Sequence, residues 1–336
     1  MRRTSTTRRF RFTRLASALG VTICLTTATA CGGSSSEGGD TDRPLVVAQS
    51  SDVLTLDPSV DTSPISLNVF KNIYDQLTNI DRDGNVQPQL ASSWESSEDA
   101  KTWTFTIEPD VTFHDGSTMT IEDIIWTYDM IMDNPSSPVA TYLTMVEDVK
   151  KVGDDQVQFT LSQPFAPFDR QVSLISILPQ KVYVEMGPEA FSREPVGSGP
   201  YKVLEWVKDD HLSLEAHADY WGEKPSIREV TVRPVPSESS RASGLETGEL
   251  DIVPILPPSS VQRLEGSDTV DVRRVASNRV LYIGFNTENP LLTEPLRQAA
   301  DMAIDRDAIT QQLLGGLGEP LGQIVAQVTF GFDESI

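Results

Sequence analysis

The chain has 336 residues, of which 49 are acidic and 27 are basic, so its net charge is −22, and 38% of its residues are hydrophobic. A chain this acidic will not bind nucleic acid or anionic lipid through a general electrostatic field. About three hundred residues beyond the N-terminal segment are enough for two lobes with their own cores.

The first thirty residues carry the features of an export signal. Six arginines and no acidic residue precede an apolar, small-residue run over 15–30, which is too short to span a bilayer as a permanent helix. The sequence Ala28-Thr29-Ala30-Cys31 resembles a bacterial lipobox, so we expect cleavage before Cys31 and lipidation of that residue. A plain secretory peptide with an incidental cysteine is the alternative. The general secretory route is expected, with Arg8-Arg9 leaving a twin-arginine signal as the second possibility.

Removal of residues 1–30 would leave a chain with one cysteine and a stronger negative charge. Cys24 leaves with the signal, so neither an internal disulfide nor a thiolate metal site can form. The remaining 21 basic and 49 acidic residues give a net charge of −28. Residues 31–43 are rich in glycine and serine, which predicts a tether that holds a folded domain off a membrane surface.

The segment from Arg43 to Ile80 predicts a strand, a turn and a helix. Residues 45–48 form a short apolar strand, and residues 49–52 form a polar turn. Apolar side chains spaced three or four apart over Ile65–Ile80 predict an amphipathic helix. Judged by its own residues, the turn is an ordinary connection between a strand and a loop.

A regular alternation marks the stretch Pro88–Asp123. Three apolar residues at alternate positions over 103–107 face one way and threonines face the other, which predicts a half-buried strand. The alternation resumes over 111–113 as a second strand or a strand-like arm, and an Asp-Gly pair then supplies a turn. Thr120, with an aspartate three residues on, predicts the N-cap of a helix whose apolar face runs over 121–131.

The rest of the chain alternates helices and strands. The predicted elements are a helix over 142–149, a strand over 156–161, a strand over 201–204, a strand over 227–235, a helix over 237–245, a strand over 281–285 and a helix over 296–306. A proline-stiffened connection over 162–168 is expected to close an inserted subdomain. The glycine-rich loop before Tyr201 is not a phosphate-binding loop, because Pro200 removes an amide donor and a strand follows it. This alternation predicts an α/β fold with helices on the faces of a sheet.

Several of these stretches carry a resemblance to a known family. The matching stretches are residues 90–107, 111–117, 195–201, 219–222, 247–252 and 281–309. Together they resemble the family 5 solute-binding proteins of ABC importers, and the resemblance covers nearly all of residues 44–325. It implies a two-lobe fold of the periplasmic-binding-protein type II class, whose lobes close on a ligand by a hinge. Family members are usually longer, so we expect the second lobe to be incomplete in this chain.

The resemblance also implies a division of the chain. The expected parts are a signal peptide at 1–30, a tether at 31–43, a first lobe at 44–68 and 176–278, a subdomain inserted in it at 69–175, and the start of a second lobe at 279–336.

In the family, the segment that precedes a Leu-Asp-Pro motif lies in the cleft between the lobes and touches the ligand backbone. The matching positions are Ser50, Ser51, Asp52, Val53 and Leu54. Val53 is expected to offer its backbone N–H and C=O groups to an extended peptide. Trp126, on the helix predicted after the Asp-Gly turn, is a candidate aromatic wall beside the ligand, with burial in the core as the alternative interpretation.

An enzyme has little support in these residues. His114, His211 and His217 are the only histidines, and their spacing matches no zinc helix. Adjacent residues on a strand point to opposite faces, so His114 and Asp115 are not expected to form a catalytic pair. No Gly-x-Ser-x-Gly motif occurs, and chance pairs are expected among 49 carboxylates, so a secreted hydrolase is only the alternative of another class. A transcription regulator would need a helix-turn-helix segment and a basic face, which the sequence lacks.

The sequence therefore predicts a non-enzymatic, extracytoplasmic lipoprotein, at the periplasmic face or the cell surface, that captures short peptides for import. Its expected partners are the peptide, the permease subunits of an ABC importer with their ATPases, and the membrane through a lipid anchor. We expect a monomer without cofactor, metal or nucleic acid. Nickel chelates, oligosaccharides and opines stay open as ligands, because in the family the residue that recognises ligand charge lies in the second lobe.

Overall fold

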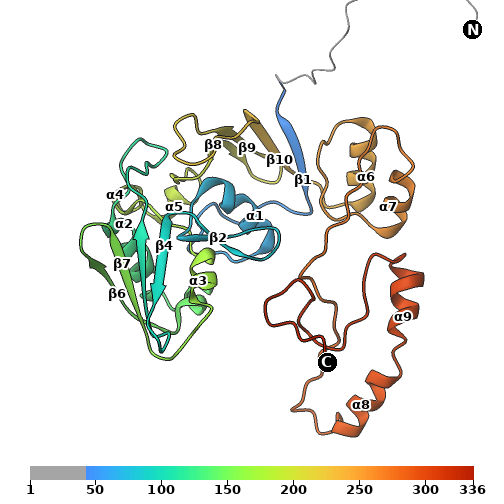
Figure 1. Ribbon diagram of the computed structural model, residues 1–336. Coiled ribbons are helices and arrows are strands. Elements are labelled where there is room, and N and C mark those ends of the chain that lie inside the picture. Colours follow the sequence, from blue (N-terminus) through green and yellow to red (C-terminus); the bar gives the residue numbers. More distant parts are fainter. Residues whose placement is uncertain (1–42) are drawn as a thin grey trace, which may run out of the picture. The chain divides into compact units, whose positions relative to one another are not determined.

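Two four-stranded sheets and a small two-stranded sheet hold the strands of the structure, a computed structural model that describes residues 43–336 (Figure 1). The predicted signal peptide, Cys31 and the rest of the tether up to residue 42 lie outside the described residues. The two-stranded sheet pairs β2 (Thr78–Ile80) with β3 (Val86–Pro88) across a turn. Helices follow and interrupt these strands, which confirms the predicted α/β class.

The first sheet has the strand order β1-β10-β9-β8. Its strands are β1 (Leu45–Gln49), β10 (Glu229–Pro234), β9 (His211–Ala216) and β8 (Tyr201–Val207). β1 and β10 run parallel, with Gln49 opposite Pro234, while the other neighbours are antiparallel. Leu212 and Leu214 of β9 are buried in one apolar cluster with Phe70 and other residues of α1 (Pro64–Ile73). The strands predicted over 45–48, 201–204 and 227–235 are confirmed, the last one within narrower bounds.

The second sheet is antiparallel throughout and has the order β4-β5-β7-β6. Its strands are β4 (Ala91–Ser96), β5 (Thr102–Ile107), β7 (Gln156–Leu161) and β6 (Val146–Val152). Trp103, Phe105 and Ile107 are buried, as the alternation predicts. They belong to a second apolar cluster in which the rings of Phe105 and Phe159 meet edge to face, 5.6 Å apart.

The helix α2 (Ile121–Met132) packs on this second sheet. Thr120 Oγ1 accepts a hydrogen bond from the Asp123 N–H, and the Asp123 carboxylate accepts one from the Thr120 N–H, so the predicted cap is confirmed as a reciprocal capping box. The buried face of α2 includes Tyr128, whose ring lies 4.8 Å from that of Phe159. The chain over 111–118 forms the expected arm, with a single bridge between Thr112 and Thr118.

The helix predicted over Ile65–Ile80 is wrong beyond Ile73, where α1 ends. Tyr74 adopts an extended backbone, and its hydroxyl donates to the Leu56 carbonyl at 2.6 Å. Residues 78–80 leave the helical path to pair with β3. Hydrogen bonds to distant parts of the chain therefore outweigh the local helical pattern.

Two other predicted elements are also wrong. The helix predicted over 142–149 is replaced by the 3-10 helix η1 (Pro138–Leu143) and the first residues of β6, which pair with β7. No strand forms over 281–285, because this segment has no ladder partner among the described residues and Tyr282 is exposed. A lone strand without a neighbour is not stable in water.

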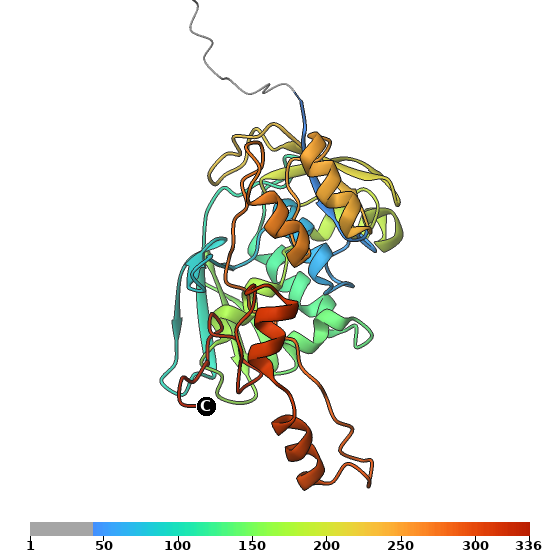
Figure 2. The same cartoon turned by 90° about the vertical axis from the view of Figure 1, so that its right-hand side faces the viewer.

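The remaining helices follow β7 along the chain. They are α3 (Phe168–Gln171), η2 (Val172–Leu174), α4 (Gln180–Met186), α5 (Pro188–Phe191), α6 (Glu238–Thr247), α7 (Pro258–Leu264), α8 (Glu294–Met302), α9 (Arg306–Ala308) and η3 (Ile309–Leu313). α6 confirms the helix predicted over 237–245. The helix predicted over 296–306 is interrupted after Met302, so that α8 and α9 are separate helices (Figure 2).

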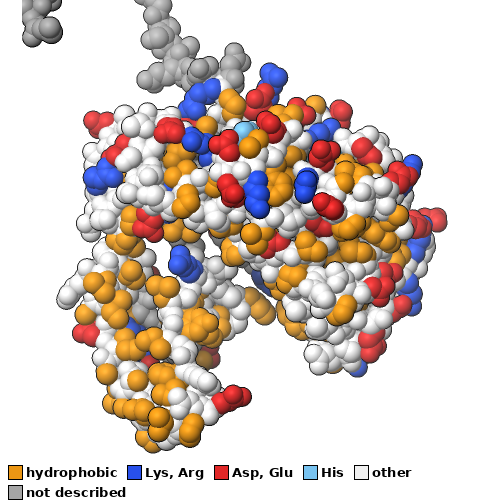
Figure 3. All heavy atoms as spheres, turned by 180° about the vertical axis from the view of Figure 1, so that it is seen from behind, with side chains coloured by type: hydrophobic (Ala, Val, Ile, Leu, Met, Phe, Trp, Pro, Cys, Tyr) orange, Lys and Arg blue, Asp and Glu red, His pale blue; other side chains and the backbone are white. Residues whose placement is uncertain are grey.

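Apolar side chains are exposed along the last part of the chain. Figure 3 shows many of them over the lower left of its view. The exposed residues of this segment include Leu281, Tyr282, Ile283, Leu291, Met302, Leu313, Ile324, Phe330 and Ile336. Large exposed apolar areas mark surfaces that contact other parts or partners. The division of the chain into lobes stays a prediction.

Candidate functional site

The carboxyl ends of the parallel strands β1 and β10 define the candidate ligand site. In open α/β sheets, ligands bind outside the carboxyl ends of parallel strands. Residues 50–54 leave the sheet at this edge after β1, and Val235 leaves it after β10, where its N–H donates to the Gln49 carbonyl at 2.7 Å. On the other side of β1, Ile252 forms a parallel bridge with Val47. Three segments of the chain therefore converge at one edge.

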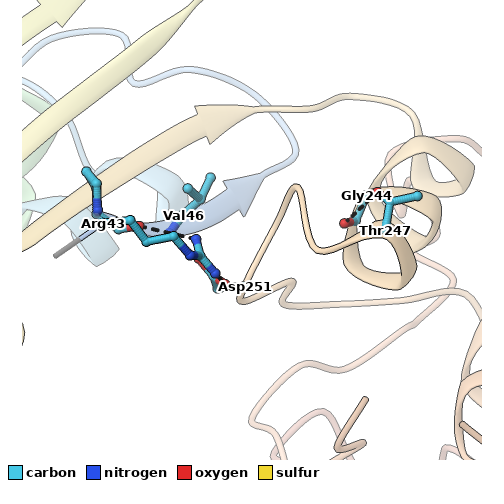
Figure 4. A network of polar contacts seen from close by, with 6 residues as sticks. Arg43, Val46, Gly244, Thr247 and Asp251 are labelled. Carbon is cyan, nitrogen blue, oxygen red and sulfur yellow. Dashed lines mark hydrogen bonds and ion pairs between the residues drawn. The ribbon is translucent and has the colours of Figure 1, made fainter. Parts of the chain in front are cut away.

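Asp251 fastens the third of these segments to the start of β1 (Figure 4). Its carboxylate accepts from the Val46 N–H at 2.8 Å and from both terminal nitrogens of Arg43. The hydrogen bond from Arg43 holds the pKa of Asp251 below its ordinary value. Asp251 lies in the stretch 247–252, one of those that carry the family resemblance, directly after α6. The last turn of α6 includes the hydrogen bond from the Thr247 hydroxyl to the Gly244 carbonyl. In this structure the aspartate of the stretch therefore holds the segment after α6 against the start of β1.

Asp52 anchors the predicted ligand segment to the first sheet. Its carboxylate accepts from the Trp206 Nε1–H at 3.1 Å and from the Asp209 N–H at 2.8 Å. It also accepts from the N–H of its neighbour Val53 at 2.8 Å. The side chain of Asp52 thus joins residues 50–54 to β8 and the turn that follows it, which makes it a positioning group for the edge.

The other residues of the segment differ in what they leave accessible. The Val53 side chain is 3% exposed and belongs to the apolar cluster beneath the first sheet, while its N–H is already bonded to Asp52. Leu54 is 77% exposed, and Ser50 and Ser51 are exposed as well. Contact of these residues with a ligand stays a prediction, in which Ser50, Ser51 and Leu54 offer the accessible side chains.

Trp126 lies half-buried on α2 and packs against the same apolar cluster as Val53. Its ring lies 5.4 Å from that of Tyr183 of α4. The Tyr183 hydroxyl donates to the Asp57 carboxylate at 2.7 Å, and burial raises the pKa of this tyrosine. The contacts of Trp126 are those of a residue at the border of the core, and its role as a wall beside a ligand stays a prediction.

The loop with two glycines, residues 197–199, packs directly on the end of α1. A Cβ atom at Gly197 would lie 2.0 Å from the Ile73 carbonyl oxygen, and one at Gly199 would lie 2.6 Å from the Ile73 carbonyl carbon. The Gly199 N–H donates to the same Ile73 oxygen at 2.9 Å. Glycine is needed at both positions because two backbones meet there.

His114 ties the arm before α2 to this glycine loop. Its Nδ1 accepts from the Gly197 N–H at 3.2 Å, and its Nε2 lies 3.0 Å from the Gly199 carbonyl oxygen, to which it donates. Burial lowers the pKa of His114 to about 4. Asp115 does not face this ring, since its carboxylate accepts from the Ser117 N–H and hydroxyl. His114 therefore has a structural environment rather than that of a catalytic base.

Asp75 occupies a buried position just beyond α1. Its carboxylate accepts from Gln89 Nε2 at 2.8 Å, from the Tyr220 hydroxyl at 3.0 Å and from Trp221 Nε1 at 2.9 Å. Burial raises the pKa of Asp75 to about 6 even though these hydrogen bonds favour the charged form. The aromatic turn at 219–222 that marks the resemblance thus binds the end of α1 through one carboxylate.

The sequence interpretation missed two buried polar side chains at the candidate edge. Arg241 of α6 is 4% exposed and donates to the carbonyls of Val235 at 2.7 Å and Pro236 at 3.0 Å. Gln49, the last residue of β1, is 7% exposed. The Nε–H of Arg241 and the Oε1 atom of Gln49 have no hydrogen-bond partner among the described residues. The available signal was Arg241 itself, the one basic residue of α6.

Metal chemistry has no support in the described part of the chain, where no group of three His, Cys, Asp or Glu side chains is placed to hold an ion. A depression of about 370 Å³ lies over β8, β9 and β10, where Glu205 and Glu229 line it, and one of about 340 Å³ lies along α6. Neither includes residues 50–54, so we place the site by the strand ends and not by these depressions. Within residues 43–336, no helix is long and apolar enough to cross a membrane.

Comparisons with known proteins connect this fold to a family. Residues 85–336 match the model described as "Bacterial extracellular solute-binding proteins, family 5 Middle". Protein XP55 of Streptomyces lividans is 31% identical over 331 residues, which cover 94% of this chain and 60% of that protein. The dipeptide-binding protein of Escherichia coli (strain K12) is 28% identical over 276 residues, which cover 75% of this chain and 52% of that protein. The chain therefore spans between half and two thirds of the length of these relatives.

A solved structure agrees with these matches. The periplasmic binding protein DppA of Helicobacter pylori, in complex with the peptide STSA, is 25% identical and has a TM-score of 0.77. The match covers 88% of this chain and 62% of that protein. The predicted fold of the periplasmic-binding-protein type II class is confirmed.

Proposed function

The chain belongs to the bacterial extracellular solute-binding proteins of family 5, and from this premise we propose that it captures short peptides outside the cytoplasm for an ABC importer. The permease subunits and their ATPases are then its partners, and it acts as a monomeric binding protein and not as an enzyme. A lipid on Cys31 anchors it to the membrane in this proposal.

The observation that carries the proposal is the edge where β1, β10 and the segment at Ile252 converge. The exposed residues Ser50, Ser51 and Leu54 lie at this edge, and the half-buried carboxylate of Asp52 holds their segment in place. The likeness to the DppA complex, which holds a peptide, supports a peptide as the ligand.

Such an edge binds a ligand through groups that every peptide shares. Backbone N–H and C=O groups along an extended peptide hydrogen-bond to the protein whatever the peptide's side chains are. We propose that the first lobe, formed by residues 44–68 and 176–278 with the insertion 69–175, supplies this edge. The second lobe, which begins at 279, closes over the ligand by a hinge.

Calorimetric titration of the complete gene product tests the ligand class. We expect micromolar or tighter binding of at least one peptide of two to five residues, and no saturable binding of oligosaccharides, opines or nickel chelates. Saturable binding of one of these other ligands, with none of any peptide, would overturn the proposal.

A further inference from the structure

Ile255 has a left-handed backbone conformation, which is energetically unfavourable for a β-branched residue. Its φ angle is +59°, in the left-handed region, although isoleucine branches at Cβ. A β-branched residue in this region is an outlier that costs about 1–3 kcal/mol and persists only where its surroundings impose it. Its side chain is also 70% exposed, so burial in a core does not offset this cost.

Hydrogen bonds place Ile255 at the candidate ligand edge. The segment that carries it pairs with β1 through Ile252, whose carbonyl accepts from the Ala48 N–H at 2.9 Å. Three residues later, the Ile255 carbonyl accepts from Arg241 Nη2 at 3.5 Å. The same guanidinium also donates to the carbonyl of Val235, whose N–H is bonded to Gln49, the last residue of β1. Ile255 therefore stands beside the ends of β1 and β10.

Arg241 is the group that holds this arrangement. Its guanidinium is buried and donates to carbonyls on two segments, at Val235 and Pro236 after β10 and at Ile255 before α7. Bonds from a charged donor to a backbone oxygen are stronger than those between neutral groups. Arg241 thus acts as a positioning residue that keeps the left-handed turn at Ile255 and directs its side chain out of the fold.

We propose that Ile255 is a specificity-determining residue of the ligand site. Its side chain forms an aliphatic wall beside residues 50–54 and favours peptides that place an apolar side chain against it. This inference rests on the proposed peptide-binding function and adds a preference to it. The backbone edge binds what all peptides share, and Ile255 selects among their side chains.

The test compares Ile255→Asn with the parent protein, both as the complete gene product. Asparagine tolerates the left-handed conformation, so the variant removes the aliphatic wall without adding strain. The peptides are trialanine and three tripeptides that carry leucine at the first, second or third position and alanine elsewhere. Val184→Asn, which changes an exposed aliphatic residue on α4, is the matched control.

We expect the parent to bind at least one leucine tripeptide more tightly than trialanine. Ile255→Asn should reduce that preference about tenfold, as for the loss of an apolar contact in a binding pocket. It should leave the affinity for trialanine within about twofold and the melting temperature no lower than the parent's. Val184→Asn should change neither affinity.

Three results would overturn the inference. One is a parent that binds all four tripeptides equally, and another is a leucine preference that survives in Ile255→Asn. The third is an equal loss of affinity for all four peptides with a lower melting temperature, which would show a structural role. A parent that binds no peptide at all would refute the proposed function itself together with the inference.

Discussion

Asp52 is a predicted ligand-site residue whose side chain instead anchors residues 50–54 to β8 and the turn after it. We predict that Asp52→Ala lowers the free energy of unfolding by about 1–3 kcal/mol, because the Trp206 Nε1–H and the N–H groups of Val53 and Asp209 lose their acceptor. Peptide affinity should fall as well, since residues 50–54 lose their anchor. Urea unfolding and calorimetry measure the two effects.

Asp83→Ala is the control for this prediction, because Asp83 is exposed in the turn between β2 and β3. It should change neither stability nor affinity by more than about 0.5 kcal/mol. If Asp52→Ala behaves like this control, the anchoring role of Asp52 is wrong.

The buried Asp75 and the half-buried His114, both near the end of α1, give stability opposite dependences on pH. Asp75 has a raised folded-state pKa of about 6, so the folded protein binds its proton more tightly than the unfolded chain and gains stability as the pH falls from 6 towards 4. His114 has a lowered folded-state pKa of about 4, so the unfolded chain binds the proton more tightly and stability is lost as the pH falls below 6.5. The two effects oppose each other over the same range.

We therefore predict that the stability deficit of Asp75→Asn relative to the parent grows as the pH is lowered from 7 to 4. The parent gains stability from protonation of Asp75 in this range, and the variant does not. Urea unfolding of both proteins at pH 7, 6, 5 and 4 measures the deficit, and the other titrating groups cancel in the comparison. A deficit that stays constant would show that Asp75 does not titrate in this range.

Single residues differ in how far their roles were predictable. The cap at Thr120 and the buried Trp103 follow from short-range patterns, because both depend on neighbours within a few positions. The roles of Asp75 and Arg241 could not be predicted in this way. The partners of Asp75 lie 14 to 146 positions away. The partners of Arg241 depend on how the segment after β10 meets the segment before α7. A sequence read alone does not show which distant groups will meet.

Among the elements, the glycine loop 197–199 and the end of α1 are packed too closely to leave room for a side chain at Gly197. We predict that Gly197→Ala lowers the free energy of unfolding by about 3 kcal/mol or more, the upper part of the range for overpacked interiors. The reason is that the new Cβ would lie 2.0 Å from a backbone oxygen of Ile73, which no rotamer can avoid.

Gly266→Ala serves as the matched control, because the nearest atom to its new Cβ is 3.9 Å away and its φ angle is not positive. Chemical denaturation of the two variants measures the difference. Equal stability of Gly197→Ala and Gly266→Ala would contradict the close contact between the loop and α1.

Elements were predictable where the local pattern and the tertiary partners agree. β5 and α2 have clear periodicity, and both bury the face that the pattern indicates. The helix predicted to Ile80 is wrong because residues 78–80 have a strand partner, and the strand predicted over 281–285 is wrong because it has none. Periodicity shows which face is apolar, but pairing decides whether a strand exists.

For the whole molecule, we first predict how the protein is attached to the membrane. We predict that Cys31→Ser moves the protein from the membrane fraction to the periplasm or the medium, because the lipid supplies its attachment in our proposal. Fractionation followed by immunoblotting measures the shift, and Cys24→Ser, within the predicted signal, is the control that should stay with the membrane. Equal membrane association of Cys31→Ser and the parent would refute the anchor.

Many apolar side chains along residues 281–336 are exposed to solvent. The chain covers 60% of protein XP55 and 62% of the DppA structure, and its residues 279–336, which we predict to begin a second lobe, form separate helices and loops. The closing of two lobes is therefore a property that we propose for the complete gene product, while the edge at β1 and β10 is already formed within the described residues.

Hydrogen–deuterium exchange of the complete gene product with and without a saturating peptide tests the central claim most directly. We predict slower exchange over residues 50–54 when the peptide is bound, because a peptide at this edge covers their backbone, and unchanged exchange over β4–β7 of the second sheet. Exchange over residues 50–54 that does not change, while calorimetry shows the peptide bound, would contradict the account.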